Sequence, residues 1–310
     1  MTTMDFFNSG MHNGFVVTDD LRSSMIINEG AEDKFFIEYE DKLFLVKDSS
    51  FNKRRKQQSL APFCEYVGSN FILASGLLSC QKCYLGQYEN RPVVICQNAF
   101  PGGEFRPFRD LHESSAGTDL STKEYTYSDV LYVLEVKEKL EGIERDEYLR
   151  SFWRMFLFDA ILGNRDRHEG NWGFYRVNQK SRFSPVIDNG SCLFPDVDLS
   201  KPWSRDFIFE RTYRMPASQF RMWKPEYVDR AMRTNFWEVL NSYSEELKDQ
   251  LDIISKLDYK NLIEVACSDV PLHVAAWFRV VIESRFRCLI LKEDFEQVYA
   301  DIEEEFHDYC

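Results

Sequence analysis

The chain has 310 residues, of which 44% are apolar and 15% aromatic, and its formal net charge is −13. This apolar content is enough to bury one large core or two adjacent lobes without support from disulfides or metals. The acidic balance disfavours broad binding to nucleic acid, which needs a basic surface, so we expect no nucleic-acid partner.

The amino terminus does not combine basic residues, a long apolar run and a small-residue cleavage site, which together mark a secretory signal. No apolar run approaches the ~18 residues that span a membrane. We therefore expect a cytoplasmic protein, and delivery by a route that uses no signal peptide stays open. The sequence does not determine the oligomeric state.

The eight cysteines lie mostly in apolar context. Cys80 and Cys83 form a lone CxxC pair, without a second pair or a histidine at zinc-finger spacing. We expect reduced, buried thiols here, with a zinc or redox site as the less favoured alternative.

The first hundred residues predict a small β-rich lobe. Two segments alternate apolar and polar residues about a short polar turn, as β-hairpins do: "KFFIEYEDKLFLVK" (34–47) and "KCYLGQYENRPVVICQ" (82–97). The turns fall at Glu40-Asp41 and Glu89-Asn90. Between the hairpins, "CEYVGSNFILASGL" (64–77) has apolar residues at helical spacing.

The rest of the chain predicts mostly helices. "FPGGEFRP" (100–107) is typical of a connector because of its prolines and glycines. Apolar periodicity then predicts helices at 127–141, 145–163 and 224–241 and a helical tail over 243–309, with short strands within 171–193.

A polar loop interrupts this pattern in "FDAILGNRDRHEGNWGFYRV" (158–177). Asp166 and Asn171 lie on the loop, and the strand-like run 183–194 contains Asp188. Magnesium-dependent phosphoryl transfer requires such a set, because Asn171 and Asp188 can offer hard oxygen ligands while Asp166 accepts the proton of the attacking hydroxyl. In the simpler alternative, Asp166 pairs with a neighbouring arginine and Asn171 caps a turn.

The first lobe offers complementary groups. Lys47 ends an apolar strand, where its charge can reach nucleotide phosphates, and Glu65 in the next helix can hold it. Gly30 precedes the first hairpin in a potential backbone nest, with Lys34 as an added cation. Taken singly, each of these is more often a surface charge or an ordinary turn, and no GxGxxG or Walker A pattern occurs.

These motifs resemble the HipA-like serine/threonine kinases, and within them the short CtkA-like group. The resemblance rests on "GNRDRHEGNWG" with "VIDNGSCLFP", on "EYVGSNFILASGL" followed by "VVICQ", and on the "GAEDK" turn. It implies an α+β, two-lobed, protein-kinase-like fold with a small β-rich N-lobe (1–99) and a larger, mostly helical C-lobe (100–310). It also implies the cofactors ATP and Mg²⁺, and a protein substrate with a serine or threonine acceptor.

The resemblance further implies roles for individual residues. Asp166 matches the catalytic base, and Asn171 and Asp188 match the metal-binding residues. The turn from Gly30 through Ala31 to Lys34 resembles the phosphate loop. Lys47 matches the lysine that contacts ATP, and Gln97, Asn98 and Ala99 match the hinge that binds adenine through its backbone.

The chain also departs from ordinary protein kinases. "NRDRH" occupies the position at which ordinary protein kinases have the HRD motif, and "DNG" occupies the position of their DFG motif. No APE motif follows. Because the first hairpin begins near residue 34, we do not expect the extra amino-terminal domain of long HipA proteins, and the resemblance does not imply a DNA-binding antitoxin partner.

Three alternatives to a protein kinase remain at this point. The "DRHxxN" run also resembles phosphoinositide kinases, which would give His168 a catalytic role and favour a basic membrane-facing patch such as "NKRRKQ" (52–57). A catalytically silent nucleotide-binding module and a transferase of AMP are the others. We favour transfer of the γ-phosphoryl group to a protein Ser or Thr, with autophosphorylation, and the physiological substrate is not encoded in any motif.

Overall fold

The computed structural model describes residues 15–18, 21, 34–48, 51–52, 57–116, 125–222 and 231–308. Gly30 and Ala31 of the expected phosphate loop, and residues 53–56 of the basic segment, lie outside these ranges. None of the helices within the described ranges is long and apolar enough to cross a membrane.

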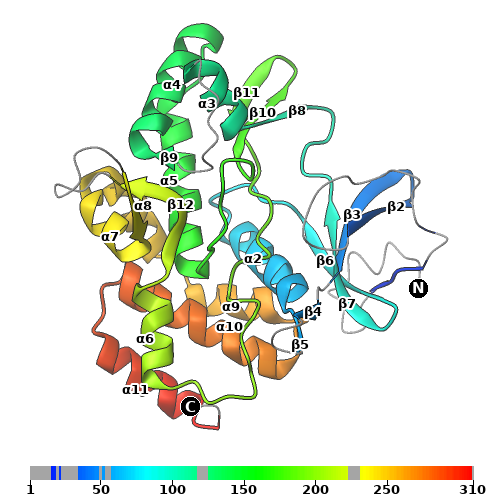
Figure 1. Cartoon of the computed structure of the whole chain (residues 1–310), viewed down its shortest axis with the longest axis vertical. Helices are drawn as coiled ribbons and strands as arrows, with labels where there is room; N and C mark the ends of the chain where they lie inside the picture. Colours follow the sequence, from blue (N-terminus) through cyan, green and yellow to red (C-terminus); the bar gives the residue numbers. More distant parts are fainter. Residues whose placement is uncertain are drawn as a thin grey trace.

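A five-stranded sheet occupies one side of the molecule (Figure 1). Its order is β1-β6-β7-β3-β2, formed by Phe15–Val16, Cys83–Tyr88, Arg91–Gln97, Lys42–Asp48 and Lys34–Tyr39. Both predicted hairpins are confirmed. Glu40 and Asp41 (φ 47° and 57°), like Glu89 and Asn90 (φ 49° and 61°), are left-handed, which is the turn geometry that matches the twist of paired strands.

The first hairpin has two distinct faces because side chains alternate along a strand. One face carries Phe35, Ile37, Phe44 and Val46, which pack in a small apolar cluster with residues of β1, β6 and β7. The opposite face carries Lys34, Phe36, Leu43, Leu45 and Lys47, and these line a cavity. The register pairs Lys34 with Lys47 and Phe36 with Leu45, so both lysines lie at the same end of this face.

Helix α2 (Ala61–Ser75) joins the sheet to the helical part of the molecule (Figure 1). It contacts β6 and β7 on one side and α9 (Tyr259–Cys267) on the other. Val67 and Phe71 of α2, Cys96 of β7 and Phe158 of the helical part belong to one apolar cluster. The main core is therefore continuous from the sheet into the helices. The predicted helix at 64–77 is confirmed, although it begins three residues earlier.

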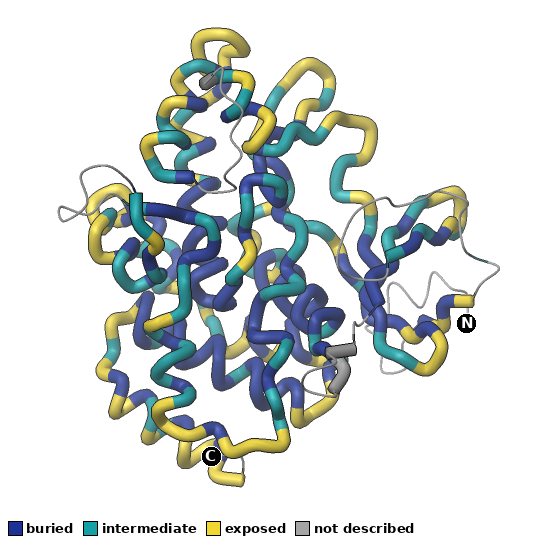
Figure 2. Tube along the Cα trace, in the orientation of Figure 1, coloured by how far each residue is buried: buried dark blue, intermediate teal, exposed yellow. Residues whose placement is uncertain are grey.

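The remainder is mostly helical, as predicted. Its helices are α3 (Phe108–Ala116), α4 (Tyr127–Glu141), α5 (Arg145–Leu162), α6 (Arg205–Tyr213), α7 (Phe236–Ser242), α8 (Ser244–Ser255), α9, α10 (Leu272–Arg285) with the π-helical turn η2 (Phe286–Ile290), and α11 (Phe295–Glu305). Figure 2 shows buried residues concentrated in the centre of the helical part, where α5 and α10 pack against each other. The expected α+β architecture, a sheet followed by a helical region, is confirmed.

Three small sheets accompany the helices. Their strands are β8 (Glu104–Pro107), β10 (Gly173–Val177) and β11 (Lys180–Phe183); β9 (Tyr125–Thr126), β12 (Pro216–Met222) and β13 (Met232–Asn235); and β4 (Phe51–Asn52) with β5 (Gln57–Gln58). The predicted connector is thus wrong over residues 104–107, which pair with β10 in antiparallel register.

Two further predictions about local structure need correction. The helix predicted at 224–241 is wrong over residues 232–235, which form β13, and it is confirmed from Phe236 onward, after the capping box of Asn235 and Glu238. The tail over 243–309 is divided into separate helices, with Asp258 capping α9 and Asp294 capping α11.

The strand-like run at 183–194 is the third correction. Strand β11 ends at Phe183, and beyond it a single parallel bridge joins Val186 to Cys80. Leu193 and Phe194 are left-handed (φ 55° and 60°), a conformation that no regular strand contains. Asp188 therefore lies on an irregular segment, which is held by the Val186–Cys80 bridge to the residues that precede β6.

Candidate active site

A cavity of about 410 Å³ lies between the first hairpin and the segment that carries Asp188. Its wall consists of the lysine-bearing face of the hairpin, Cys96 of β7 with residues 98–100 that follow this strand, and three residues from elsewhere: Gln81, Ile187 and Asp188. The volume lies within the range of roughly 300–1,000 Å³ that is usual for small-molecule sites. Apolar side chains line one part of the cavity, and Lys34, Lys47 and Asp188 supply charge.

Lys47 joins two carboxylates at the edge of this cavity. Its Nζ lies 2.8 Å from Glu65 Oε2 and 2.8 Å from Asp188 Oδ1. Burial alone would lower the pKa of Lys47, but the two carboxylates outweigh it and raise the pKa well above its usual value. Lys47 is therefore a fixed cation, and its contact with Glu65 is the one that the sequence predicted.

Asp188 is held ionised by the same contact. Burial opposes its ionisation, yet the neighbouring Lys47 ammonium lowers the pKa of this carboxyl to about 2. Its backbone is left-handed, with φ 61°, a conformation that aspartate tolerates better than most residues. The side chain is 41% exposed, so an anionic oxygen faces the cavity and can bind a cation.

Asn189 ties this segment to helix α2, a role that sequence reasoning missed. Its backbone N–H donates to Glu65 Oε1 at 2.8 Å, and its Nδ2 donates to Ser69 Oγ at 3.0 Å. The next residue, Gly190, leaves little room: a Cβ there would lie 3.3 Å from Glu65 Oε2. The last two residues of the "DNG" motif therefore both lie against the Glu65 carboxylate: Asn189 donates a hydrogen bond to it, and Gly190 leaves space for it.

Arg167 connects the polar loop to the same segment. Its guanidinium pairs with Asp159 of α5, with Nε 3.0 Å from Oδ2, and both residues are about 2% exposed. It also donates to the carbonyl oxygen of Ile187 and, at 2.6 Å, to Asn189 Oδ1. The alternative in which Arg167 pairs with Asp166 is therefore wrong.

Asp166 is exposed, and the loop around it is shaped by hydrogen bonds to its backbone. Its N–H donates to Asn164 Oδ1 at 3.0 Å, and its carbonyl oxygen accepts from Asn171 Nδ2 at 3.2 Å. The Asp166 carboxylate forms no ion pair within the described ranges. Because Asn171 uses its amide nitrogen in the loop, its Oδ1 is the atom suited to a metal ion.

The geometry of His168 disfavours it as a base. Gly170 N–H donates to His168 Nδ1 at 3.0 Å. A neutral imidazole that accepts through Nδ1 carries its proton on Nε2, where it is a donor. The ring is therefore better suited to orienting the loop or a phosphate than to removing a proton.

The expected hinge is only partly on the cavity wall. Asn98 and Ala99 line the cavity, whereas Gln97 does not. The Gln97 N–H donates to the carbonyl oxygen of Lys82 at 2.9 Å, and its own carbonyl accepts from Gln81 Nε2 at 2.8 Å. Both backbone groups of Gln97 are thus already engaged, which leaves Asn98 and Ala99 as the nearer candidates for contact with a base.

Helix α3 braces the polar loop through a buried histidine that sequence reasoning also missed. His112 Nδ1 lies 3.2 Å from Glu169 Oε1, and its Nε2 lies 3.5 Å from Asp129 Oδ1. Burial alone would lower the pKa of His112, but hydrogen bonds to Asp129 and Glu169 raise it to about 9. His112 is therefore a cation at neutral pH, held between two carboxylates.

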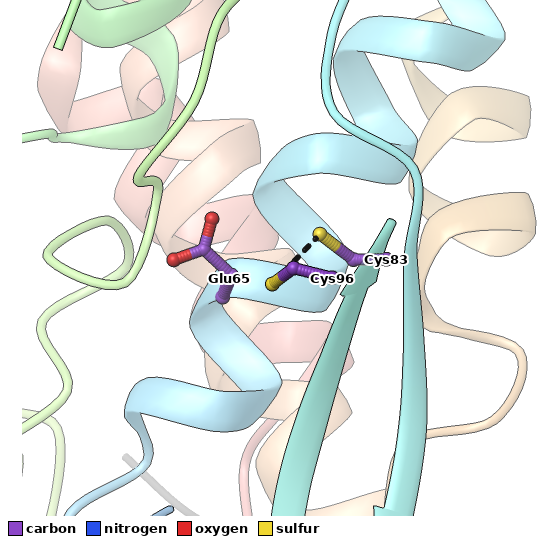
Figure 3. A group of neighbouring side chains, drawn as sticks. All are labelled: Glu65, Cys83 and Cys96. Atoms are coloured by element: carbon purple, nitrogen blue, oxygen red, sulfur yellow. Dashed lines mark hydrogen bonds between the residues drawn. The ribbon is translucent and has the colours of Figure 1, made fainter. Parts of the chain in front are cut away.

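Glu65 of α2, Cys83 of β6 and Cys96 of β7 form a group of potential metal ligands (Figure 3). The two sulfur atoms lie 3.7 Å apart, and Glu65 already bonds Lys47 and Asn189. Burial raises the pKa of the Cys83 thiol, so it stays protonated, whereas a metal would require the thiolate. We interpret this group as packing. The seven cysteines in the described ranges are all buried and free of disulfides.

The chain is similar to known protein kinases in both sequence and structure. The chain is 31% identical over 235 residues to the serine/threonine-protein kinase CtkA of Helicobacter pylori, covering 72% of this chain and 68% of that protein. The crystal structure of the H. pylori proinflammatory kinase CtkA superimposes with a TM-score of 0.73 at 25% identity, over 93% of this chain and 98% of the other.

Two other similarities are more distant. HipA, from the Shewanella oneidensis MR-1 HipA–HipB complex with operator DNA, shares the fold with a TM-score of 0.50 at 12% identity, over 92% of this chain and 68% of the other. Residues 114–267 match the sequence model of the family described as phosphatidylinositol 3- and 4-kinase.

The fold is kinase-like, and its lysine, glutamate and aspartate meet at one cavity. The chain belongs to the CtkA-like serine/threonine protein kinases. Membership of this family implies use of a nucleotide and a protein substrate.

Proposed function

We propose that this protein transfers the γ-phosphoryl group of ATP, with Mg²⁺, to a serine or threonine hydroxyl of a protein. The observation that carries the proposal is the position of Lys47, whose ammonium contacts the buried Glu65 and the cavity-facing Asp188 at the same time. Phosphoryl transfer needs a fixed cation beside a carboxylate that can hold a metal, because catalysis is mainly positioning and charge stabilisation.

ATP would occupy the cavity of about 410 Å³. The adenine would lie against Asn98 and Ala99, and the phosphates would lie near Lys34 and Lys47, which are paired across β2 and β3. Gly30 and Ala31 would complete the phosphate loop as predicted from the sequence. The division into an N-lobe (1–99) and a C-lobe (100–310) is part of the same proposal, since residues of both lobes would then line the cavity.

The catalytic groups would come from the polar loop and the segment after β11. Asn171 Oδ1 and the Asp188 carboxylate fit a magnesium ion, which prefers a few hard oxygen ligands and substrate phosphates. That ion would neutralise charge on the phosphates. Asp166, whose carboxylate has no described ion-pair partner, would accept the hydroxyl proton and orient the acceptor oxygen.

The test is transfer of label from γ-labelled ATP by the purified protein with Mg²⁺, measured on the protein itself and on a generic basic protein. We expect label on both, and we expect intact mass to show added phosphate on the kinase. Both signals should vanish in Asp166→Ala and in Asp188→Ala. Nucleotide binding by calorimetry without any transfer would instead indicate a silent nucleotide-binding module, and label that appears only from α-labelled ATP would indicate transfer of AMP.

Transfer to a phosphoinositide is the second candidate function. Its support is the match of residues 114–267 to the phosphatidylinositol 3- and 4-kinase family. Vesicles that contain phosphatidylinositol, offered beside the protein substrate, separate the two candidates: label in the lipid fraction favours this alternative, and label confined to protein excludes it.

A further inference from the structure

A second pocket, of about 270 Å³, lies on a part of the molecule that shares no residue with the nucleotide cavity. Three segments form it: residues 77–79 after α2, residues 147–154 of α5, and residues 182–184 at the end of β11. These segments are far apart in the sequence, so only the fold brings their polar groups together. None of the proposed catalytic roles uses this pocket.

Positive charge is concentrated in this pocket. Arg150, Arg154 and Arg182 line it, and Glu147 is its one carboxylate. Arg150 and Arg154 lie one turn apart on α5, an arrangement of like charges that weakens a helix unless something compensates. None of the three arginines forms an ion pair with a residue in the described ranges, although the whole chain carries a net charge of −13.

Two of the guanidinium groups are held in place. Arg154 Nε donates to Gln250 Oε1 at 2.7 Å, and its Nη1 donates to the carbonyl oxygen of Leu77 at 3.1 Å. Arg182 lies over the ring of Tyr175, 4.9 Å from its centroid. Burial, and then the charge of Arg150, lower the pKa of Arg154, as expected for a cationic cluster that lacks a counter-ion.

Hydroxyl groups complete the lining. Ser79, Ser151 and Ser184 all face the pocket. Ser184 Oγ accepts a hydrogen bond from Gly173 N–H at 3.1 Å, so its own O–H can donate to a ligand. The pocket thus combines guanidinium forks and hydroxyl donors, the groups that bind phosphate oxygens in proteins.

We infer that this pocket binds a phosphate-type dianion, either as a phosphorylated serine or threonine side chain or as free inorganic phosphate. Three arginines and one glutamate leave two positive charges, which a dianion matches and a carboxylate does not. The volume exceeds that of one phosphate group and leaves room for the side chain that carries it.

The test compares two double variants that remove the same charge. Arg150→Gln/Arg182→Gln changes two exposed pocket residues, and Arg109→Gln/Arg176→Gln changes two exposed arginines elsewhere. Each protein is saturated with Mg²⁺ and a non-hydrolysable ATP analogue, so that Lys34 and Lys47 are occupied. It is then titrated by calorimetry with inorganic phosphate and with a short neutral peptide that contains phosphoserine or plain serine. Melting temperatures confirm that both variants are folded.

We expect the parent and the control variant to bind a phosphate-bearing probe and the pocket variant to bind it at least about tenfold more weakly, a loss of about 1.4 kcal/mol. Tighter binding of the phosphopeptide than of phosphate would identify a phosphorylated protein as the source, and the reverse order would identify the free anion. The inference is overturned if neither probe binds the parent, if the two variants lose affinity equally, or if the plain serine peptide binds as well as the phosphopeptide.

Discussion

Lys47 Nζ lies 2.8 Å from Asp188 Oδ1, across 141 residues of sequence, and this contact joins the sheet to the segment proposed to hold the metal. The same ammonium neutralises Glu65, which is only 1% exposed. Lys47 therefore has two roles: it balances the negative charge of the buried Glu65, and it supplies positive charge to the cavity. The two roles can be separated by mutation.

Lys47→Met should lower both phosphoryl transfer and stability. Loss of one charge-stabilising donor reduces turnover by about 100- to 1,000-fold. Glu65 would be left buried without its partner, which costs about 3–5 kcal/mol in the free energy of unfolding. Denaturant unfolding and label transfer measure the two effects. The double variant Lys47→Met/Glu65→Gln should regain most of the stability and none of the activity, and a double variant as unstable as Lys47→Met would contradict the role given to Glu65.

Asp166→Asn should abolish most of the transfer and leave stability unchanged. The carboxylate is exposed and forms no ion pair in the described part of the chain, so its loss costs the fold little. Removal of a general base lowers the turnover rate by about 100- to 10,000-fold. Asp249→Asn, at an exposed carboxylate of α8 that likewise forms no ion pair in the described ranges, is the matched control. Unchanged turnover in Asp166→Asn would transfer the role of base to another group, with His168 the first to examine.

Asn171→Ala should raise the Mg²⁺ concentration that gives half-maximal transfer by at least about tenfold, since an oxygen ligand is lost. Excess Mg²⁺ should then restore part of the rate. Removal of Mg²⁺ by a chelator should stop transfer in the parent. A variant whose Mg²⁺ dependence equals that of the parent would show that Asn171 only shapes the loop through its hydrogen bond to Asp166.

Stability should fall as the pH rises from about 6.5 to about 9, because of His112. Its pKa in the folded protein is about 9 against a usual 6.5, so the stabilisation is complete below the lower value and is lost as the pH passes the higher one. The expected change is about 2 kcal/mol, allowing for the partial exposure of Asp129. Denaturant unfolding of the parent and of His112→Gln across this range measures it. Equal pH slopes in the two proteins would show that His112 is not charged in the folded state.

Local patterns predicted the local structure. Two polar residues between alternating strands were enough to place both hairpins, and apolar periodicity placed α4 and α5 within one or two residues. The Asn235–Glu238 capping box was also visible in the sequence and could have corrected the start of α7. Strand β8 was missed because its partner, β10, lies about 70 residues further along the chain.

Within the site, the sequence predicted the charged residues and missed the groups that hold them. The 18-residue spacing of Lys47 and Glu65 pointed to their contact, which the structure contains. The links from Arg167 to Asn189 and from His112 to Glu169 join distant segments, and no periodic pattern reports such pairs. The three arginines of the second pocket meet for the same reason, only after folding.

Helix α2 shares its core with both the sheet and the helical region, and this affects how the molecule comes apart. Residues such as Phe71 and Phe158 pack ring to ring across that junction, with centroids 6.2 Å apart. A chain cut after residue 99 would expose the apolar side of α2 to water, so the β-rich part is not an independent folding unit. The main core, which α2 shares with the sheet and the helices, should melt in a single cooperative transition, and a nucleotide that binds beside the sheet should raise the melting temperature of the distant helices as well.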